Sequence, residues 1–221
     1  SEKSPRHRVN NNLPGTQAFC PLIRRTQKLV DYKAADLGRA AREVFGEVPS
    51  DVVARASAFL LLEDSKASFA IEGERLSSSR AQRWGQALGQ AGRSSLDGEE
   101  LLRLQQLVIG DNRFTRMGWR REGGFVGHHD RDSGAPLPEH ISARPQDIKS
   151  LIGGLLDTEK KLEAESFDPV LCAALIAFGF VFIHPFADGN GRIHRYLIHH
   201  VLSSRGIGKP GVIFPVSSVI L

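Results

Sequence analysis

Apolar residues recur every three or four positions along most of this chain, which is the spacing of an amphipathic helix. Leu22 to Phe45 has helical composition, Val48-Pro49-Ser50 interrupts it, and a second pattern, capped by Ser50 or Asp51, runs to Glu72. The further helical positions are Trp84, Ala87, Leu88 and Ala91, then Leu101, Leu104 and Val108, and then Ile148, Ile152, Leu155 and Leu156. Because helical patterns dominate, we predict an all-α fold class.

The stretch from Pro169 to Ile183 is apolar at almost every position instead of on one face. A helix that is apolar all round is buried in a core. Asp168 and Pro169 form a typical helix start, and Pro185 cannot continue the helix. We therefore expect a central helix that ends at His184 and presents this residue to a loop.

Twelve residues, from His184 to Arg195, collect side chains suited to the chemistry of a nucleotide triphosphate. The neutral imidazole of a histidine can remove a proton near pH 7. A carboxylate such as that of Asp188 holds Mg²⁺ together with substrate phosphates. This part of the sequence predicts a base beside a site for a phosphate chain.

The second half of the same segment predicts an anion site. A turn that glycines make flexible leads into a helix, and the first N–H groups of that helix favour an anion. Arg192 and Arg195 are three residues apart, so they share one helix face, from which arginines can stabilise charge on phosphoryl oxygens. The turn consists of Gly189, Asn190 and Gly191.

The segment resembles the signature of the Fic family (Fic/DOC-type), His-x-Phe-x-Asp/Glu-Gly-Asn-Gly-Arg-x-x-Arg, and matches it at every specified position. Such a match is far more specific than a lone glycine-rich loop. Members of this family are mostly AMP transferases, which move AMP from ATP to a Ser, Thr or Tyr hydroxyl of a target protein. The resemblance implies that His184 deprotonates the hydroxyl and Asp188 holds Mg²⁺. The implied phosphate ligands are Gly189, Asn190, Gly191, Arg192 and Arg195.

A second resemblance lies at residues 68–73, which are similar to the inhibitory motif Ser/Thr-x-x-x-Glu-Gly/Asn of many Fic proteins. In those proteins the glutamate enters the nucleotide site from a separate helix and pairs with the second signature arginine. Here the motif residues are Ser68, Glu72 and Gly73, so the resemblance implies a Glu72–Arg195 pair and the self-inhibited class with an N-terminal inhibitory helix. A carboxylate in the place of the γ-phosphate would exclude the triphosphate. The alternative is a solvated Glu72 before a helix-ending glycine.

A third resemblance concerns Gly118-Trp119-Arg120 and Phe125-Val126-Gly127, which are similar to the segment that leads into the family's target-docking flap, a β-hairpin. Residues 128–144 have the composition of a hairpin, with a turn at Asp130–Gly134. An extended target segment could pair with its edge through backbone hydrogen bonds. The expected edge residues are His140, Ile141 and Ser142. An exposed loop is the alternative.

Composition is that of a soluble globular protein: 41% of the 221 residues are apolar and 24% are charged. No apolar run is long enough to span a bilayer, and the N-terminal residues lack the hydrophobic part of a secretory signal, so we expect a cytoplasmic protein without a membrane partner. Cys20 and Cys172 do not make a disulfide framework, and Cys172 is expected in the core. No Cys/His spacing indicates zinc.

The formal net charge is only +4, with a sequence pI of about 9.3. The basic residues Arg113, Arg116, Arg120 and Arg121 are interleaved with Phe114 and Trp119. Such a cluster could attract nucleic acid or an acidic protein surface, but it is more often a solvated face. A nucleic-acid partner is therefore left open.

We expect three regions: residues 1–48 as an N-terminal helical extension, 49–96 as the inhibitory helix and the helix after it, and 97–221 as the catalytic core, with the chain continuing beyond Leu221. The expected activity is self-inhibited, Mg²⁺-dependent AMP transfer from ATP to a protein hydroxyl, and a homo-oligomer is left open. One alternative is a hydrolase in which Glu72 positions a water that removes AMP. Another is a regulatory module that senses ATP without turnover, although a pure sensor has no need of the base His184.

Overall fold

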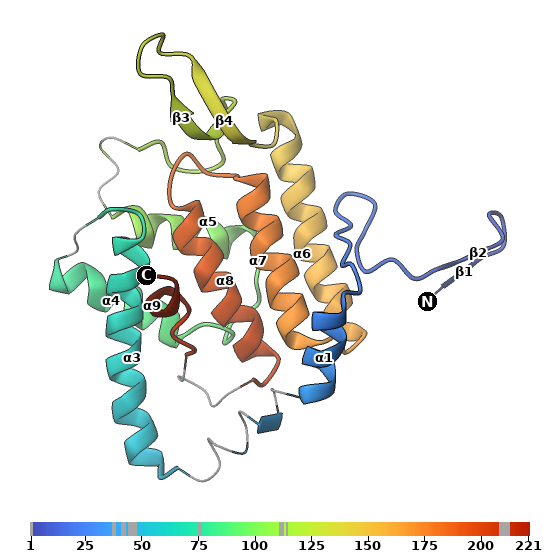
Figure 1. The fold of residues 1–221 in the computed structure, drawn as a ribbon, viewed down its shortest axis with the longest axis horizontal. Coiled ribbons are helices and arrows are strands. Elements are labelled where there is room, and N and C mark those ends of the chain that lie inside the picture. Colours follow the sequence, from blue (N-terminus) through green and yellow to red (C-terminus); the bar gives the residue numbers. More distant parts are fainter. Residues whose placement is uncertain are drawn as a thin grey trace.

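The computed structural model describes residues 2–36, 39–40, 43, 48–74, 77–110, 113, 115–207 and 213–221. Over these residues the chain is mostly helical, with two small antiparallel sheets of two strands each (Figure 1). This architecture confirms the predicted helical fold with a small β-hairpin.

The polar N-terminal residues, which belong to the region predicted as a helical extension, form a two-stranded ribbon instead. Strand β1 (Glu2–Ser4) pairs with β2 (Val9–Asn11) in antiparallel register. All residues of β2 are exposed, so backbone hydrogen bonds, and not burial of an apolar face, define this ribbon. In Figure 1 it extends away from the helical body.

Helix α1 (Gln27–Ala35) begins five residues later than the predicted helix from Leu22. Thr26 sets this start, because its hydroxyl oxygen accepts a hydrogen bond from the Leu29 N–H at 3.3 Å. No residue of α1 is buried, so it packs no apolar face on the core. The predicted end of the helix, Phe45, lies outside the described residues.

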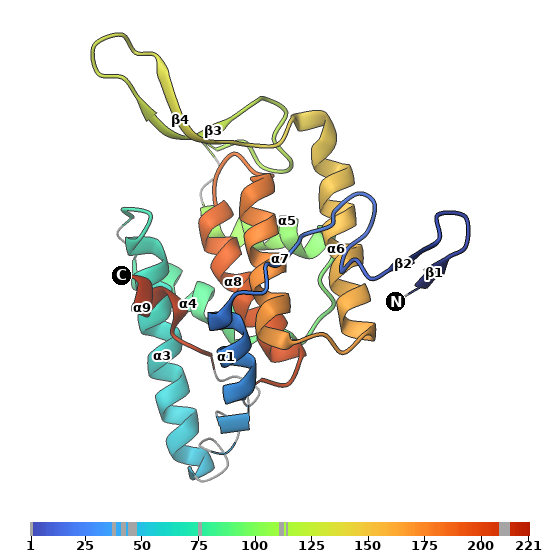
Figure 2. The ribbon, with the colours of Figure 1, turned by 45° about the vertical axis from the view of Figure 1, so that its right-hand side comes forward.

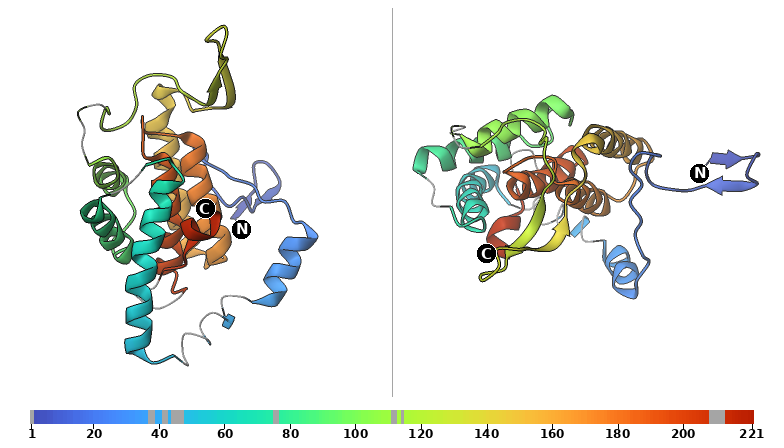
Figure 3. Two further views of the ribbon diagram at one scale, coloured as in Figure 1. Left: turned by 60° about the vertical axis from the view of Figure 1, so that its left-hand side comes forward. Right: turned by 90° about the horizontal axis from the view of Figure 1, so that it is seen from above.

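Helix α3 (Ser50–Ala70) runs along one side of the molecule, and α4 (Ser78–Gly89) packs against it (Figure 3). The sequence predicted that α3 reaches Glu72, but the helix ends at Ala70. There the N–H of Glu72 bonds the Phe69 carbonyl at 3.0 Å, and Gly73, with φ of +74°, reverses the chain. Glu72 therefore projects from a turn and not from the helix itself.

The core lies around α7 (Pro169–Ile183) and α8 (Asn190–Ser204), which lie side by side in the centre of the molecule (Figure 1). Helix α6 (Ile148–Ala164) packs on α7, and α5 (Gly98–Ile109) packs on α8. The Asp168 carboxylate accepts from the first N–H groups of α7, as predicted. Fully buried side chains in these helices include Leu101, Leu104, Val108, Ile148, Leu155, Cys172, Ile176, Phe180, Ile193 and Leu197.

Near the end of the chain, helix α9 (Val216–Ile220) packs on α3. The Ser218 N–H donates to the buried carboxylate of Asp64 on α3 at 3.0 Å. The turn-rich connection predicted between Gly206 and Pro215 falls partly outside the described residues, because residues 208–212 are among those left out.

Strands β3 (Phe125–His129) and β4 (Pro136–Ile141) form the predicted hairpin, which stands beyond the loop between α7 and α8 (Figure 2). A short 3₁₀ turn, η1 (Pro145–Asp147), then leads into α6. The hairpin turn is at the predicted residues, because the Asp130 carboxylate accepts from the Ser133 N–H at 2.8 Å. Strand β4 begins earlier than the predicted strand and ends before Ser142.

Over the described part of the chain, no helix is both long enough and apolar enough to cross a membrane.

Candidate functional site

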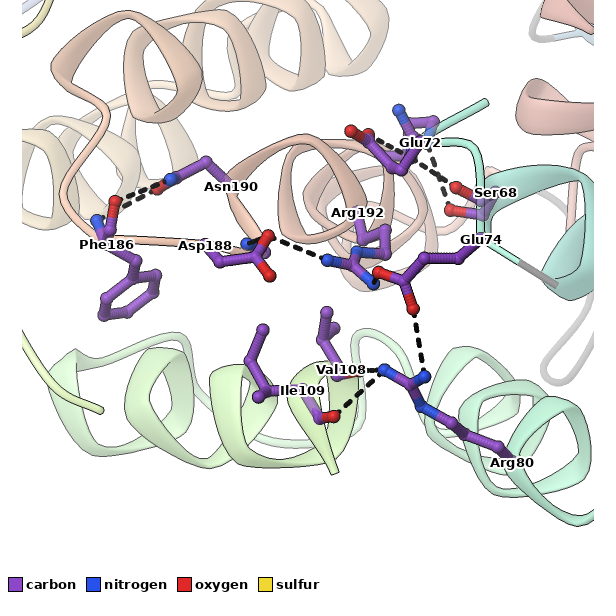
Figure 4. Close-up of polar contacts among 12 residues, drawn as sticks. Ser68, Glu72, Glu74, Arg80, Val108, Ile109, Phe186, Asp188, Asn190 and Arg192 are labelled. Atoms are coloured by element: carbon purple, nitrogen blue, oxygen red, sulfur yellow. Dashed lines mark hydrogen bonds and ion pairs between the residues drawn. The ribbon is translucent and has the colours of Figure 1, made fainter. Parts of the chain in front are cut away.

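The loop between α7 and α8 is tied to itself by Asn190. The side chain of this residue accepts from the Phe186 N–H at 3.0 Å and donates to the Phe186 carbonyl at 2.8 Å (Figure 4). Phe186 is fully buried. Gly189, with φ of +92°, then starts α8 in a conformation that glycine adopts without strain. Because the Asn190 side chain is occupied by the loop, its predicted contact with phosphate stays a prediction.

Arg120 fixes the His184 end of this loop through hydrogen bonds to backbone carbonyls. Its guanidinium donates to the carbonyls of His184 at 2.7 Å and Glu122 at 2.7 Å, and also to the Ala143 carbonyl. Its backbone N–H donates to the Pro185 carbonyl at 3.0 Å. His184 itself has φ of +55°, which is unusual for a residue with a side chain. The buried guanidinium of Arg120 thus links the end of α7, the segment before β3 and the segment after β4.

Two aromatic rings support the same loop. Trp119 and Phe186 form an isolated antiparallel bridge, and their rings are stacked at a centroid distance of 4.9 Å. A cavity of about 360 Å³ opens beside His184. It is lined in part by Gly123, Gly124, Phe125 and Ser142. The catalytic candidate therefore faces open space on one side and a fixed backbone on the other.

The environment of His184 favours the neutral imidazole. Burial lowers its pKa below the ordinary value of 6.5, and the positive charge of Arg120 lowers the pKa further. A neutral ring is the form that can accept a proton near pH 7.

The Asp188 carboxylate is suited to bind Mg²⁺ as a single protein ligand. Its side chain is half exposed, and one carboxylate oxygen accepts from the Gly189 N–H at 2.5 Å and from Arg192 at 2.9 Å. No group of three or more metal-ligating side chains occurs among the described residues. A lone carboxylate suits Mg²⁺, which retains waters and binds substrate phosphates in addition to one or two protein ligands.

The structure brings the motif glutamate and the second signature arginine together. The Arg195 guanidinium donates to the Glu72 carboxylate at 2.8 Å and to the Ser68 carbonyl at 2.7 Å, and its Nε donates to the Ser68 hydroxyl at 3.1 Å. Arg195 is buried, whereas the Glu72 side chain is 35% exposed. The alternative of a fully solvated Glu72 does not apply in this state.

Glu72 also lies against Gly191, in the turn of the predicted anion site. A Cβ atom added to Gly191 would lie 2.3 Å from Oε1 of Glu72. The carboxylate therefore occupies the space beside the first turn of α8, where the free N–H groups of a helix attract an anion.

Arg192 is paired with a residue that the sequence did not indicate. It forms ion pairs with Asp188 and with Glu74, and Glu74 also contacts Arg80 at 3.0 Å (Figure 4). Glu74 follows Glu72 by two residues, and Gly73 between them turns the chain. The available signal was a second acidic residue directly after the motif, but Arg80 has no sequence signature.

The three predicted flap residues have different surroundings. The His140 ring packs on Phe182 at 4.5 Å and contacts its carbonyl at 2.7 Å. Ile141 is exposed, whereas Ser142 is buried and its N–H donates to the Gly124 carbonyl at 3.0 Å. The N–H of Ser142 is thus already used within the chain, and pairing of this edge with a target stays a prediction.

The basic cluster is smaller on the surface than its sequence indicated. Arg120 is buried within the loop contacts described above, and Arg116 pairs with Glu122 at 3.2 Å. Phe114 lies outside the described residues. Nothing in this arrangement adds support for a nucleic-acid partner.

Known proteins share this fold and this segment. Residues 95–202 match the model of the Fic/DOC family. A crystal structure of a Fic domain containing signaling protein from Bacteroides thetaiotaomicron has a TM-score of 0.64 at 19% identity, over 83% of this chain and 77% of that chain. Fic-1 from C. elegans has a TM-score of 0.58 at 18% identity, over 87% of this chain and 62% of that chain.

Curated relatives are similar over a shorter segment. Protein adenylyltransferase Fic of Nematostella vectensis is 34% identical over 70 residues, which are 32% of this chain and 16% of the relative. Protein adenylyltransferase fic-1 of Caenorhabditis elegans is 35% identical over 81 residues, 37% of this chain and 14% of the relative. The chain therefore matches only a small part of these proteins. Residues 95–202 are thus similar to the Fic/DOC family, and the chain is distantly similar to protein adenylyltransferase Fic.

Proposed function

We propose that this chain is a protein adenylyltransferase whose resting state is inhibited by Glu72. The observation that carries the proposal is the position of one carboxylate, which pairs with Arg195 at 2.8 Å and lies against Gly191. Both residues belong to the segment that would bind the phosphates of ATP. The names of the similar proteins support the choice of AMP as the transferred group.

In the proposed reaction, a Ser, Thr or Tyr hydroxyl of the target attacks the α-phosphorus of ATP. His184 takes the hydroxyl proton, a P–O bond to the target forms, and the bond to the leaving pyrophosphate breaks. Bound to Asp188, Mg²⁺ would neutralise charge on the phosphates. Arg192 and Arg195 would stabilise the charge that moves onto the leaving group.

Inhibition follows from charge and space. Glu72 supplies the negative charge that Arg195 would otherwise take from an outer phosphate, and its atoms fill the room beside Gly191. The Glu72 side chain is partly exposed, so it can leave without unfolding a core. The triphosphate and Glu72 would therefore compete for one place.

ATP labelled on the α- or the γ-phosphate tests the reaction type. We expect the Glu72→Gly variant to transfer α-label to protein and the parent chain to transfer little, while Glu72→Gly/His184→Ala transfers none. Transfer of γ-label would indicate kinase chemistry and contradict the proposal. Binding of ATP without transfer by any variant would favour the sensor alternative.

The reverse reaction is a second candidate, because burial lowers the pKa of His184 while the negative charge of Glu72 acts on the same ring and opposes this lowering to a small extent. A carboxylate close to this histidine could position a water for removal of AMP. Release of AMP from a modified target by the parent chain, and its loss in Glu72→Gln, would support this activity. Equal release by both would exclude a role of Glu72 in it.

A further inference from the structure

Two arginines from different helices meet at one carboxylate in the phosphate region. Arg192 of α8 and Arg80 of α4 each contact a different oxygen of Glu74, in both cases through Nη1. Their guanidinium carbons lie 4.8 Å and 4.9 Å from the centroid of the same buried ring, that of Phe69. Figure 4 shows the Glu74 carboxylate between the two guanidinium groups.

Both cations are fixed by groups other than Glu74. Nη2 of Arg80 donates to the carbonyls of Val108, at 2.5 Å, and Ile109, at 3.0 Å, at the end of α5. Nη2 of Arg192 donates to Asp188 at 2.9 Å. Each arginine would therefore keep its place if Glu74 moved away, with Nη1 left to receive another anion.

Glu74 does not use the full donor capacity of this pair. The Nε atoms of Arg80 and Arg192 are buried and have no hydrogen-bond partner among the described residues. The Arg192 side chain is only 2% exposed, so water does not readily replace a missing acceptor. A phosphate group offers more acceptor oxygens than a carboxylate, and arginines are well suited to bind it.

The Glu74 carboxylate is exposed enough to move away from the two arginines. Its side chain is 34% exposed, and it follows the turn at Gly73 that also carries Glu72. A Cβ atom on Gly73 would meet nothing within 4 Å, so the positive φ, and not lack of space, explains the glycine here. One turn thus presents two carboxylates to two signature arginines, Glu72 to Arg195 and Glu74 to Arg192.

We propose that Arg80 and Arg192 form a two-arginine site for an outer phosphate group of the nucleotide, and that Glu74 fills this site in the resting state. The proposal rests on the proposed function for the identity of the ligand as a nucleotide triphosphate. It adds Arg80, which lies outside the signature segment, to the phosphate ligands. It also adds Glu74, beside Glu72, as a second carboxylate of the turn at Gly73 that competes with a phosphate group.

Equilibrium binding in the Glu72→Gly background tests this site without any need for turnover. The probes are the non-hydrolysable analogue AMP-PNP with Mg²⁺, and AMP, which lacks the outer phosphates. Adding Glu74→Gln should tighten AMP-PNP binding about tenfold, since one charge-assisted contact no longer competes, and should leave AMP binding unchanged. Adding Arg80→Gln to this double variant should cancel the gain, while Arg80→Lys, which keeps the cation, should retain part of it.

Glu63→Gln is the matched control, because Glu63 is a partly exposed glutamate of α3, the helix before the turn, and pairs with Lys66 instead of with Arg80 or Arg192. Thermal melting and AMP affinity report whether each variant is folded. The proposal is overturned if Glu74→Gln binds AMP-PNP no tighter than Glu63→Gln, if AMP gains as much as AMP-PNP, or if Arg80→Gln leaves the gain intact.

The same titrations separate this site from the proposed function. Tighter AMP-PNP binding with Glu74→Gln, but not with Glu72→Gly relative to the parent, would contradict the Glu72 mechanism and leave the two-arginine site standing. Absence of AMP-PNP binding in every folded variant would overturn both.

Discussion

The two ends of the signature loop are held in opposite ways. At the His184 end, the buried guanidinium of Arg120 bonds three backbone carbonyls, and Trp119 stacks on Phe186. At the arginine end, the contacts come from Glu72 and Glu74, carboxylates that are about one third exposed and belong to the turn after α3.

Under the proposed function, this difference would separate catalysis from control of nucleotide binding. The backbone carbonyls that Arg120 bonds cannot leave without local unfolding, so under the proposed function His184 would keep its orientation while Glu72 and Glu74 are displaced. Side-chain carboxylates on an exposed turn can be exchanged for phosphates at modest cost. We therefore expect substitutions at the His184 end to reduce the rate of the chemical step, and substitutions at the arginine end to change nucleotide access.

The largest expected effect is that of Arg120→Gln. In the Glu72→Gly background it should lower kcat for AMP transfer about a hundredfold, because a small displacement of the base is enough for such a loss. Affinity for AMP-PNP should change little. The pKa of His184, followed by NMR, should rise, since the charge of Arg120 helps to hold it down.

Arg121→Gln is the control for this variant, because Arg121 is the exposed neighbour of Arg120. A kcat unchanged in folded Arg120→Gln, or an equal loss in both variants, would contradict the role of Arg120 as a positioning residue.

The pH profile should show the next largest effect. Because burial lowers the pKa of His184, the neutral base persists to below the ordinary value of 6.5. Transfer by Glu72→Gly should therefore stay level from about pH 8 down through the ordinary histidine value of 6.5 and fall only at lower pH, with a slope that approaches about tenfold per pH unit below the pKa of His184. A half-maximal rate at a pH above 6.5 would show that burial does not control this group.

A smaller effect is expected of Ser68→Ala at the arginine end. It removes the hydroxyl that accepts from Arg195 at 3.1 Å but keeps the backbone contact and Glu72. Loss of one such hydrogen bond should destabilise the inhibited state by about 1 kcal/mol, so basal transfer should rise about fivefold. Ser65→Ala is the control, because Ser65 is buried in the same helix and, among the described residues, its hydroxyl bonds only its own helix backbone, at the Leu61 carbonyl. Equal rates in the two variants would remove Ser68 from the inhibitory contact.

The smallest expected effect is that of His140→Ala in the hairpin. The His140 ring packs on Phe182 and contacts its carbonyl, so its loss should loosen the hairpin over the loop. The KM for a protein target should rise about threefold, with kcat and ATP affinity little changed. Steady-state kinetics with varied target would measure it. A fall in kcat alone would place His140 with the catalytic end instead.

Local features explain what the sequence could predict. Asp168, Pro169 and Pro185 fix the ends of α7 through neighbours in the chain, and the apolar run between them places this helix in the core. The hairpin turn at Asp130 to Gly134 is likewise defined by its own residues. Resemblance to a family motif indicated the Glu72–Arg195 contact, which joins residues 123 positions apart.

Tertiary contacts that no family motif indicated were not predicted. Glu74 and Arg192 are 118 positions apart, and Arg120 and His184 are 64 apart, with no periodic pattern to connect them. Arg120 was interpreted as part of a surface cluster. Its burial was not predictable, because it depends on three backbone carbonyls that only the folded chain brings together. The N-terminal ribbon was missed for another reason: its strands bury no side chain, so no apolar alternation marks them.

The most direct test of the competition between Glu72 and an outer phosphate is the affinity of the parent chain and of Glu72→Gly for AMP-PNP with Mg²⁺, measured side by side by calorimetry. Removal of the carboxylate beside Arg195 and Gly191 should tighten binding about tenfold or more. Equal affinity of the two proteins would contradict the account.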